Sequence, residues 1–171
     1  MKEKKYLVII DMQNDFVTGA LKNDDAVGVA EKIVYYYQHN RFDRVVFTMD
    51  THNQDYLNTL EGQNLPVPHC IKGTRGWEIV DELLFLAKQS TVVEKTTFGS
   101  LSWKKFIKDP TEITICGLVS DICVCSNALI LRAMFPNTKI KVVSNLCAGL
   151  TKEKHNAAMS VMESCQIEVE E

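Results

Sequence analysis

The sequence lacks long apolar runs and a strong charge of either sign. No run approaches the ~20 apolar residues that span a bilayer. The stretch YLVII at 6–10 ends at Asp11 and is too short for the hydrophobic part of a signal peptide. The net charge of −3 gives no electrostatic reason to expect nucleic acid or an anionic membrane as a partner. We therefore expect a cytoplasmic protein that binds neither membrane nor nucleic acid.

Internal repeats, low-complexity tracts and linkers rich in proline or glycine are also missing. Without a linker, a chain of 171 residues with 46% hydrophobic residues predicts one domain over 1–171, with a real core. No glycine-rich phosphate loop follows the stretch at 6–10, because DMQNDF stands there instead. That absence counts against nucleotide binding.

Cysteine is present six times, but a core-rich chain without an export signal does not need disulfides. We expect reduced thiols at all six positions. A buried cysteine usually serves as a small hydrophobic residue, so a catalytic role needs support from its surroundings.

Short β-branched runs alternate along the chain with longer segments that carry apolar residues at helical spacing. This alternation predicts an α/β fold, a doubly wound parallel sheet in a three-layer α/β/α sandwich. The first four runs are apolar throughout, which is typical of strands covered on both faces. The predicted strands are 6–10, 44–49, 91–95, 112–117, 139–144 and 166–170, and the predicted helices are 24–40, 76–89, 101–108, 121–135 and 151–165.

Reactive side chains follow four of the predicted strands. Asp11 follows the first strand, Asp50 and His52 follow the second, Lys95 ends the third, and GLVSDICV with Cys123 follows the fourth. A single aspartate at a strand end is often only a turn residue or a helix cap. Folds of this class nevertheless place their chemistry at the carboxyl ends of the strands. Because reactive side chains from four strands meet at this edge of the sheet, the sequence predicts a functional site there.

The segment GLVSDICVCSN holds two cysteines with one residue between them. Cys123 lies in the first turn of the predicted helix 121–135, where free N–H groups and the helix dipole favour a thiolate. Cys125 lies ~200° further round that helix, so the pair cannot share a disulfide, a metal or a site. Cys125 lines up instead with Ile122 and Leu129 in a packing stripe.

The region after the second strand has the composition of a metal site. Asp50 and His52 lie on the same side of an extended segment, and His69 follows in PVPHC, where two prolines hold the chain extended. One aspartate and two histidines suit a divalent metal, Zn²⁺ first and Mn²⁺ or Fe²⁺ as alternatives. Glu61, in the loop between, is a candidate oxygen ligand, directly or through water. The alternative is that both histidines are ordinary loop residues.

The other two histidines have simpler explanations. His39 ends a predicted helix, where a cation suits the dipole. His155 falls in TKEKHN, which we expect to be an exposed helical turn.

Four segments are recognisable together: LVIIDMQNDF, MDTH with PVPHCIKGTRGWE, EKTTFGS and GLVSDICV. In this order they resemble the motifs of the isochorismatase-like cysteine hydrolases, and most of all those of the nicotinamidases. The resemblance implies a sheet of about six strands in the order 3-2-1-4-5-6. It also implies a catalytic triad of Cys123, Asp11 and Lys95, and a metal site at Asp50, His52 and His69, with Glu61 matching a ligand that only some members use.

The resemblance implies a mechanism as well. A cis peptide bond between Leu118 and Val119 would aim the N–H groups of Val119 and Cys123 at an oxyanion. Asp11 would take the thiol proton, and a thioester would form as ammonia leaves. The implied reaction is nicotinamide to nicotinate, a step of NAD salvage, with the metal on the pyridine nitrogen directly or through water. Family members are often dimers or larger, so we expect a homo-oligomer, a dimer or a tetramer.

One departure from the nicotinamidase pattern keeps the substrate open. Nicotinamidases often place an aromatic residue shortly before the second metal histidine, where this chain has NLPVPH at 64–69. Phe16, Phe98 and Leu101 remain as candidate walls of the substrate pocket. Another small amide, carbamoyl or ureido compound is therefore an alternative substrate, and a non-catalytic domain that binds a metal or mononucleotide is a third reading. The thiol of Cys123 counts against isochorismatase activity itself.

Overall fold

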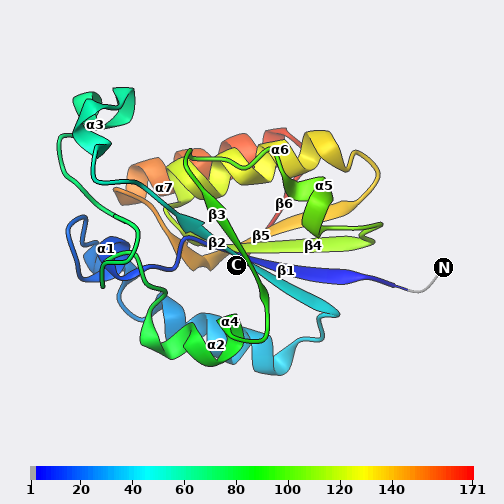
Figure 1. The fold of residues 1–171 in the computed structure, drawn as a ribbon. Helices are drawn as coiled ribbons and strands as arrows, with labels where there is room; N and C mark the ends of the chain where they lie inside the picture. The colour runs from blue at the N-terminus through cyan, green and yellow to red at the C-terminus, as the bar shows by residue number, and fades with distance from the viewer. Residues whose placement is uncertain (1–2) are drawn as a thin grey trace.

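The computed structural model describes residues 3–171, which form one parallel sheet with helices on both faces (Figure 1). The six strands lie in the order β3-β2-β1-β4-β5-β6, and every neighbouring pair is parallel. The predicted α/β/α architecture and strand order are confirmed. The strands are β1 (Lys5–Ile10), β2 (Arg44–Asp50), β3 (Thr91–Lys95), β4 (Glu112–Leu118), β5 (Lys139–Ala148) and β6 (Glu168–Glu170).

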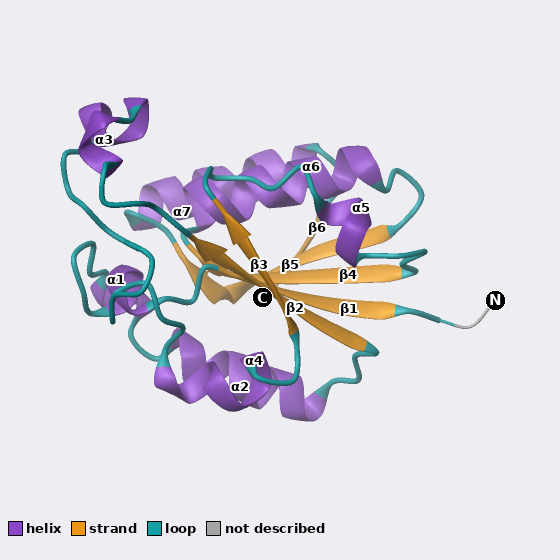
Figure 2. Cartoon of the chain, in the orientation of Figure 1, coloured by secondary structure: helices purple, strands orange, loops and turns teal. Residues whose placement is uncertain are grey.

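The helices divide between the two faces of the sheet (Figure 2). Helices α2 (Val29–His39) and α4 (Leu84–Ala87) cover one face, and α5 (Trp103–Phe106), α6 (Cys125–Met134) and α7 (Lys152–Ser164) cover the other. The short α1 (Asn14–Val17) follows β1, whereas α3 (Leu60–Asn64) stands away from the sheet. No helix within residues 3–171 is both long and apolar enough to cross a membrane. Residues 1 and 2 of the predicted domain lie outside the described part.

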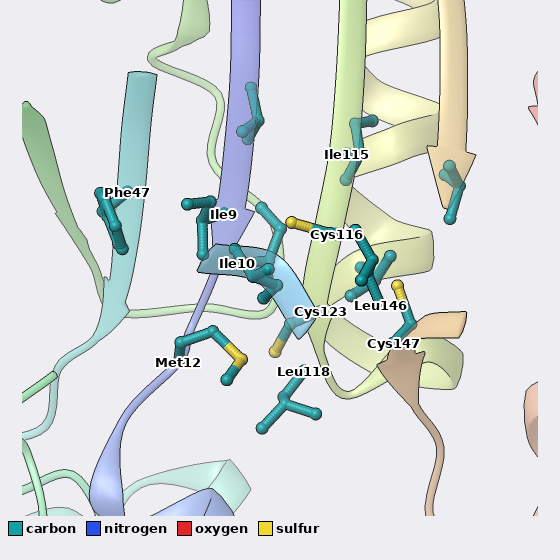
Figure 3. Packing of buried hydrophobic residues seen from close by; sticks show 14 of the residues in the cluster. Ile9, Ile10, Met12, Phe47, Ile115, Cys116, Leu118, Cys123, Leu146 and Cys147 are labelled. Carbon is teal, nitrogen blue, oxygen red and sulfur yellow. The ribbon is translucent and has the colours of Figure 1, made fainter. Parts of the chain in front are cut away.

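The core lies around the two central strands. Every residue of β1 after Lys5 is buried, and so is every residue of β4 after Glu112. This follows from the helices on each face, which remove both sides of a central strand from water. Figure 3 shows apolar side chains of both strands packed close to Cys123.

The expectation that the first four strands are covered on both faces is wrong for β3. Thr91, Val92 and Glu94 are exposed, and only Val93 and Lys95 of this strand are buried. The physical reason is position, because β3 is the edge strand of the sheet and α4 is too short to cover it.

Three predicted helices also differ from the structure, and the one expected at 101–108 consists only of the four residues of α5. The helix expected at 76–89 begins only at Asp81, as a 3₁₀ turn that continues into α4. Residues 76–78 before it form turns, and the next two residues pair with the chain after β1: Val80 N–H donates to Met12 O, and Ile79 bridges Gln13. The helix expected at 24–40 is interrupted at Gly28. A 3₁₀ turn comes before this glycine, and α2 begins only after it, because the φ of Gly28 is +84° and not helical.

The chain order of the strands reverses between β1 and β4, which are neighbours at the centre of the sheet. Crossovers leave these two strands toward opposite faces, so their carboxyl ends frame a crevice. At Gly117 the backbones of β1 and β4 come so close that a Cβ atom on this residue would lie 2.1 Å from Ile10 O. The φ of Gly117 is +117°. Only glycine fits there. Beside this glycine the register between β4 and β5 shifts: Ile115 pairs with Val142 but Gly117 pairs with Cys147, so the extra residues lie in β5.

Candidate active site

Asp11, Lys95 and Cys123 meet in this crevice, as expected from their places at strand ends. Lys95 Nζ lies 2.6 Å from Asp11 Oδ2 and 3.7 Å from Cys123 Sγ. All three residues are buried. The sheet therefore brings a carboxylate, an ammonium group and a thiol into one small volume.

Thr48, which sequence reasoning missed, orients Asp11. Its hydroxyl donates to Asp11 Oδ1 at 2.6 Å, and Asp11 N–H points back to the same residue, 3.2 Å from Thr48 O. Asp11 has a φ of +46°, a conformation that few residues other than glycine adopt. One carboxylate oxygen is thus held by Thr48, and the other faces Lys95.

Burial and neighbouring charge set the protonation of these groups. Burial raises the pKa of Asp11, and the Lys95 charge lowers it only in part. Burial would lower the pKa of Lys95, but Asp11, Cys123 and Asp50 raise it above its ordinary value, so the amine is an ammonium group. Burial and the Asp11 charge raise the pKa of Cys123 well above its usual range. Burial therefore opposes the thiolate form of Cys123 that the helix position favours.

The segment that carries Cys123 leaves β4 through a cis peptide bond between Leu118 and Val119, as the family resemblance implied. Residues Ser120–Val124 then form one π-helical turn, in which Val124 N–H donates to Val119 O at 3.1 Å, and α6 follows directly. The helical segment therefore begins one residue before the predicted 121. Cys125 is only half-buried and packs against the core with Ile122 and Leu129, as the predicted stripe requires.

Asn127, which sequence reasoning also missed, holds the segment that carries Cys123. Its buried amide nitrogen donates to Cys123 O at 2.8 Å and to Phe98 O at 3.0 Å. Its oxygen accepts from Ser100 N at 2.9 Å and from Trp103 Nε1 at 3.1 Å. This one side chain ties Cys123 to the loop after β3. A lone asparagine within the apolar pattern of 121–135 was the available signal.

Asp50, His52, Glu61 and His69 form a second group beside the first. His52 Nε2 lies 3.0 Å from Asp50 Oδ2, and Glu61 Oε1 lies 3.6 Å from His52 Nε2 and 3.7 Å from His69 Nε2. One ligand atom from each of the four residues lies within 4.8 Å of all the others. The side-chain Nδ1 of His69 is held by Val67 O at 2.8 Å, which leaves Nε2 for a ligand. This donor set fits a divalent metal ion.

The DMQNDF segment supports this second group. Gln13 Nε2 donates to Asp50 O at 2.8 Å, and Gln13 Oε1 accepts from Asp50 N, also at 2.8 Å. Asp15 Oδ2 accepts from Cys70 N at 2.8 Å and so fixes the residue after His69. Sequence reasoning placed only Asp11 and Phe16 of this segment in the site.

Asp50 connects the two groups. Its Oδ1 lies 3.3 Å from Lys95 Nζ, while its Oδ2 faces the histidines. Burial alone would raise the pKa of Asp50, but hydrogen bonds with His52 and His69 and the Lys95 charge hold it well below its ordinary value. Asp50 is therefore an ionised carboxylate that can pair with a cation through either oxygen.

A cavity of about 550 Å³ opens over both groups, and Cys123, Asp50 and His69 reach its wall. Phe16 and Phe98 line it, as predicted, and the Phe16 ring lies 5.7 Å from that of His69. Leu101 does not line it and is 78% exposed, since it lies beyond the loop that turns at Phe98. The lining residues that sequence reasoning missed include the large apolar side chains of Leu21, Leu65, Ile122 and Leu150.

His155 is not the exposed residue that the sequence suggested. It is half-buried, and both ring nitrogens lie within hydrogen-bond distance of serine hydroxyls. His39, in contrast, ends α2 as expected.

Comparison with known proteins places this arrangement in a family. A nicotinamidase from Schizosaccharomyces pombe is 29% identical over 203 aligned residues, covering 95% of this chain and 91% of the relative. The solved structure of a Bacillus subtilis nicotinamidase/pyrazinamidase is 30% identical, with a TM-score of 0.85 over 98% of this chain and 100% of that one. A zinc complex of a Pyrococcus horikoshii pyrazinamidase, 22% identical, shares the fold with a TM-score of 0.81 over 97% and 98% of the two chains. The family model for the isochorismatase domain matches residues 5–171. The chain therefore belongs to the isochorismatase domain family.

Proposed function

We propose that the protein is a cysteine-dependent amidase that converts nicotinamide to nicotinate and ammonia, a step of NAD salvage. The observation that carries the proposal is the buried contact of Lys95 with Asp11 and Cys123, in the wall of a cavity that also contains the Asp50 and His69 side chains. Relatives with the same fold over nearly the whole chain are nicotinamidases by name.

In the first half-reaction, Asp11 accepts the Cys123 proton while Sγ attacks the amide carbon. The Lys95 ammonium, 3.7 Å from Sγ, stabilises negative charge on sulfur as the proton leaves. The N–H groups of Val119 and Cys123 hold the oxyanion. Asp11 then donates its proton to the amide nitrogen, the C–N bond breaks, ammonia leaves, and a thioester to Cys123 remains.

In the second half-reaction, Asp11 takes a proton from water, and the resulting hydroxide attacks the thioester carbon. The C–S bond breaks, nicotinate is released, and the sulfur recovers its proton from Asp11. Thr48 keeps the carboxylate in one orientation through both steps, because its hydrogen bond occupies Oδ1 and leaves Oδ2 for the proton.

Asp50, His52, His69 and Glu61 would hold a divalent metal ion, Zn²⁺ first and Mn²⁺ or Fe²⁺ as alternatives. When bound, such an ion supplies a Lewis acid that orients a ring nitrogen. The zinc complex of the Pyrococcus horikoshii relative supports this choice of metal. Phe16, whose ring lies 5.7 Å from that of His69, offers an apolar wall to the substrate ring in the same cavity.

The second candidate is a hydrolase for a carbamoyl or ureido compound. In the segment 64–68, directly before His69, the residue that lines the cavity is Leu65, so this segment offers no aromatic ring for stacking. The same triad chemistry would serve either substrate.

An ammonia-release assay on zinc-loaded protein separates these possibilities. We expect nicotinamide to be hydrolysed faster than benzamide, which lacks the ring nitrogen, and an N-carbamoyl amino acid not to be hydrolysed. Release from the carbamoyl compound alone would refute the nicotinamide assignment and keep the hydrolase class. Release from none of the three would refute the amidase proposal.

We propose the same chain to act as a single domain over 1–171, in the cytoplasm, and as a homo-oligomer. Light scattering after size-exclusion chromatography measures the last of these directly, and a monomer at micromolar concentration would contradict it.

A further inference from the structure

His155 forms a bridge that the proposed chemistry does not use. Its Nδ1 lies 2.9 Å from Ser120 Oγ, and its Nε2 lies 3.1 Å from Ser144 Oγ. Ser144 belongs to β5, His155 to the first turns of α7, and Ser120 to the π-helical turn that contains Cys123. One side chain thus joins a sheet strand and a neighbouring helix to the nucleophile segment.

Ser120 occupies a sensitive place in that segment. It is fully buried, it directly follows Val119, and it begins the turn that presents Cys123. A rotation of the backbone at Ser120 would move the Val119 N–H and the Cys123 thiol relative to each other. The hydrogen bond to His155 opposes such a rotation.

The loop between β5 and α7 packs tightly against the same turn. A Cβ atom at Gly149 would lie 2.9 Å from both His155 Cβ and Ser120 Oγ, closer than side chains normally approach. Asp121 Oδ1 also accepts a hydrogen bond from Leu150 N at 2.9 Å. Two consecutive residues of the nucleophile turn are therefore held by this loop and helix.

The bridge is directional because the imidazole is neutral. Burial lowers the pKa of His155, and the opposing charge of Asp121 does not reverse the shift. A neutral ring has one N–H donor and one acceptor nitrogen, so it donates to one serine and accepts from the other. The contact with Ser144 therefore fixes the orientation of the His155 ring, and the ring in turn holds the side chain of Ser120.

We propose that His155 is a positioning residue: acting through Ser120, it holds the Val119–Cys123 turn so that the thiol and the backbone N–H groups converge on one carbonyl group. The inference rests on the proposed amidase function, since it assigns those groups to attack and to oxyanion binding. His155 contacts neither the reacting atoms nor the cavity wall.

Three substitutions at this position test the role. His155→Ala removes both contacts, and we expect kcat to fall by about 10- to 100-fold, because small misplacements of reacting groups have effects of that size. KM should stay within about twofold, since the ring-binding walls are untouched. His155→Asn places an amide near the position of Nδ1 and should recover most of kcat, whereas His155→Gln, which reaches toward the Nε2 position, should not.

The difference in kcat between His155→Asn and His155→Gln distinguishes a positioning role from a merely structural one. If kcat of the Ala, Asn and Gln variants simply follows their melting temperatures, or if KM rises while kcat is unchanged, the proposal is wrong. Ser144→Ala provides a milder variant in case His155→Ala does not fold. It keeps the Ser120 contact, and we expect a decrease in kcat of only a few-fold.

A readout independent of amide hydrolysis separates this inference from the proposed function. We expect His155→Ala to change the rate of Cys123 alkylation by iodoacetamide, followed by peptide mass spectrometry with Cys125 as internal reference, and His155→Asn to restore it. Wild-type protein that hydrolyses no amide would refute the proposed function alone. An alkylation rate at Cys123 that is unchanged in His155→Ala would refute the positioning role whether or not the protein is an amidase.

Discussion

The two groups in the crevice are built in different ways. Asp11, Lys95 and Cys123 come from the ends of strands or the turn directly after one, and all are at most 5% exposed. The second group shares Asp50 with the sheet, but His52, Glu61 and His69 come from the long connection between β2 and β3. The side chain of Glu61 is 21% exposed and lies on α3, which stands apart from the sheet.

From this difference we expect the side chains of the first group to be held rigidly and those of the second group to adapt more easily. Lys95 and Asp50 are paired in register across β2 and β3, so their separation is set by the sheet. The histidines depend instead on contacts within the loop, where the Tyr56 ring lies 4.7 Å from that of His52 and 5.0 Å from that of His69. We expect changes in the first group to abolish the reaction and changes in the outer part of the second to modulate it.

The largest expected effect is at Cys123, the proposed nucleophile. Cys123→Ala should lower the rate of ammonia release from nicotinamide by at least about 10⁴-fold, because loss of a covalent nucleophile removes the pathway itself. Cys125→Ala is the matched control and should stay within about twofold of wild type. Zinc content, measured by inductively coupled plasma mass spectrometry, should be the same in both. A Cys123→Ala protein with more than a tenth of wild-type activity would contradict the distinction between the two groups.

The next effect is at Lys95, the residue that touches both groups. Lys95→Met leaves Asp11 and Asp50 buried without their shared cation, and we expect the free energy of unfolding to fall by about 3–5 kcal/mol. Urea denaturation at neutral pH measures this value. Lys105→Met, on an exposed lysine of α5, should change it by no more than about 0.5 kcal/mol. Equal stability of the two variants would show that the Lys95 contacts do not join the groups energetically.

The smallest effect is expected at Glu61. Glu61→Gln keeps the size of the side chain but removes a charged ligand, and we expect zinc affinity to fall by about tenfold, on the order of 1.4 kcal/mol. Competition with a chromophoric chelator measures the affinity, with Glu82→Gln as the exposed control. His52→Ala should weaken zinc binding much more. Loss of affinity in Glu61→Gln as large as in His52→Ala would remove the proposed difference between the inner and outer parts of this group.

The sequence by itself determined the architecture and the inner site. Alternating β-branched and helical segments predict a parallel sheet, and in such a sheet the residues after the strands gather at one edge. That reasoning reached Asp11, Asp50, Lys95 and Cys123 because their roles depend on local position in the chain. The strand order was predicted from the family that the motifs resemble, because periodicity alone does not indicate it.

Only the tertiary structure decided which polar residues support the site and which surfaces are buried. Thr48 and Gln13 act through partners far along the chain, so no local pattern marks them, and the lone asparagine at 127 does not reveal that it binds Ser100 and Trp103. The exposure of β3 follows from its place at the sheet edge, and the non-helical start of the segment 76–89 follows from pairing with the chain after β1. The resting protonation of Cys123 also depends on burial. The physical reason is the same in each case: periodicity is local, whereas burial and hydrogen-bond partners are set by the packing of distant segments.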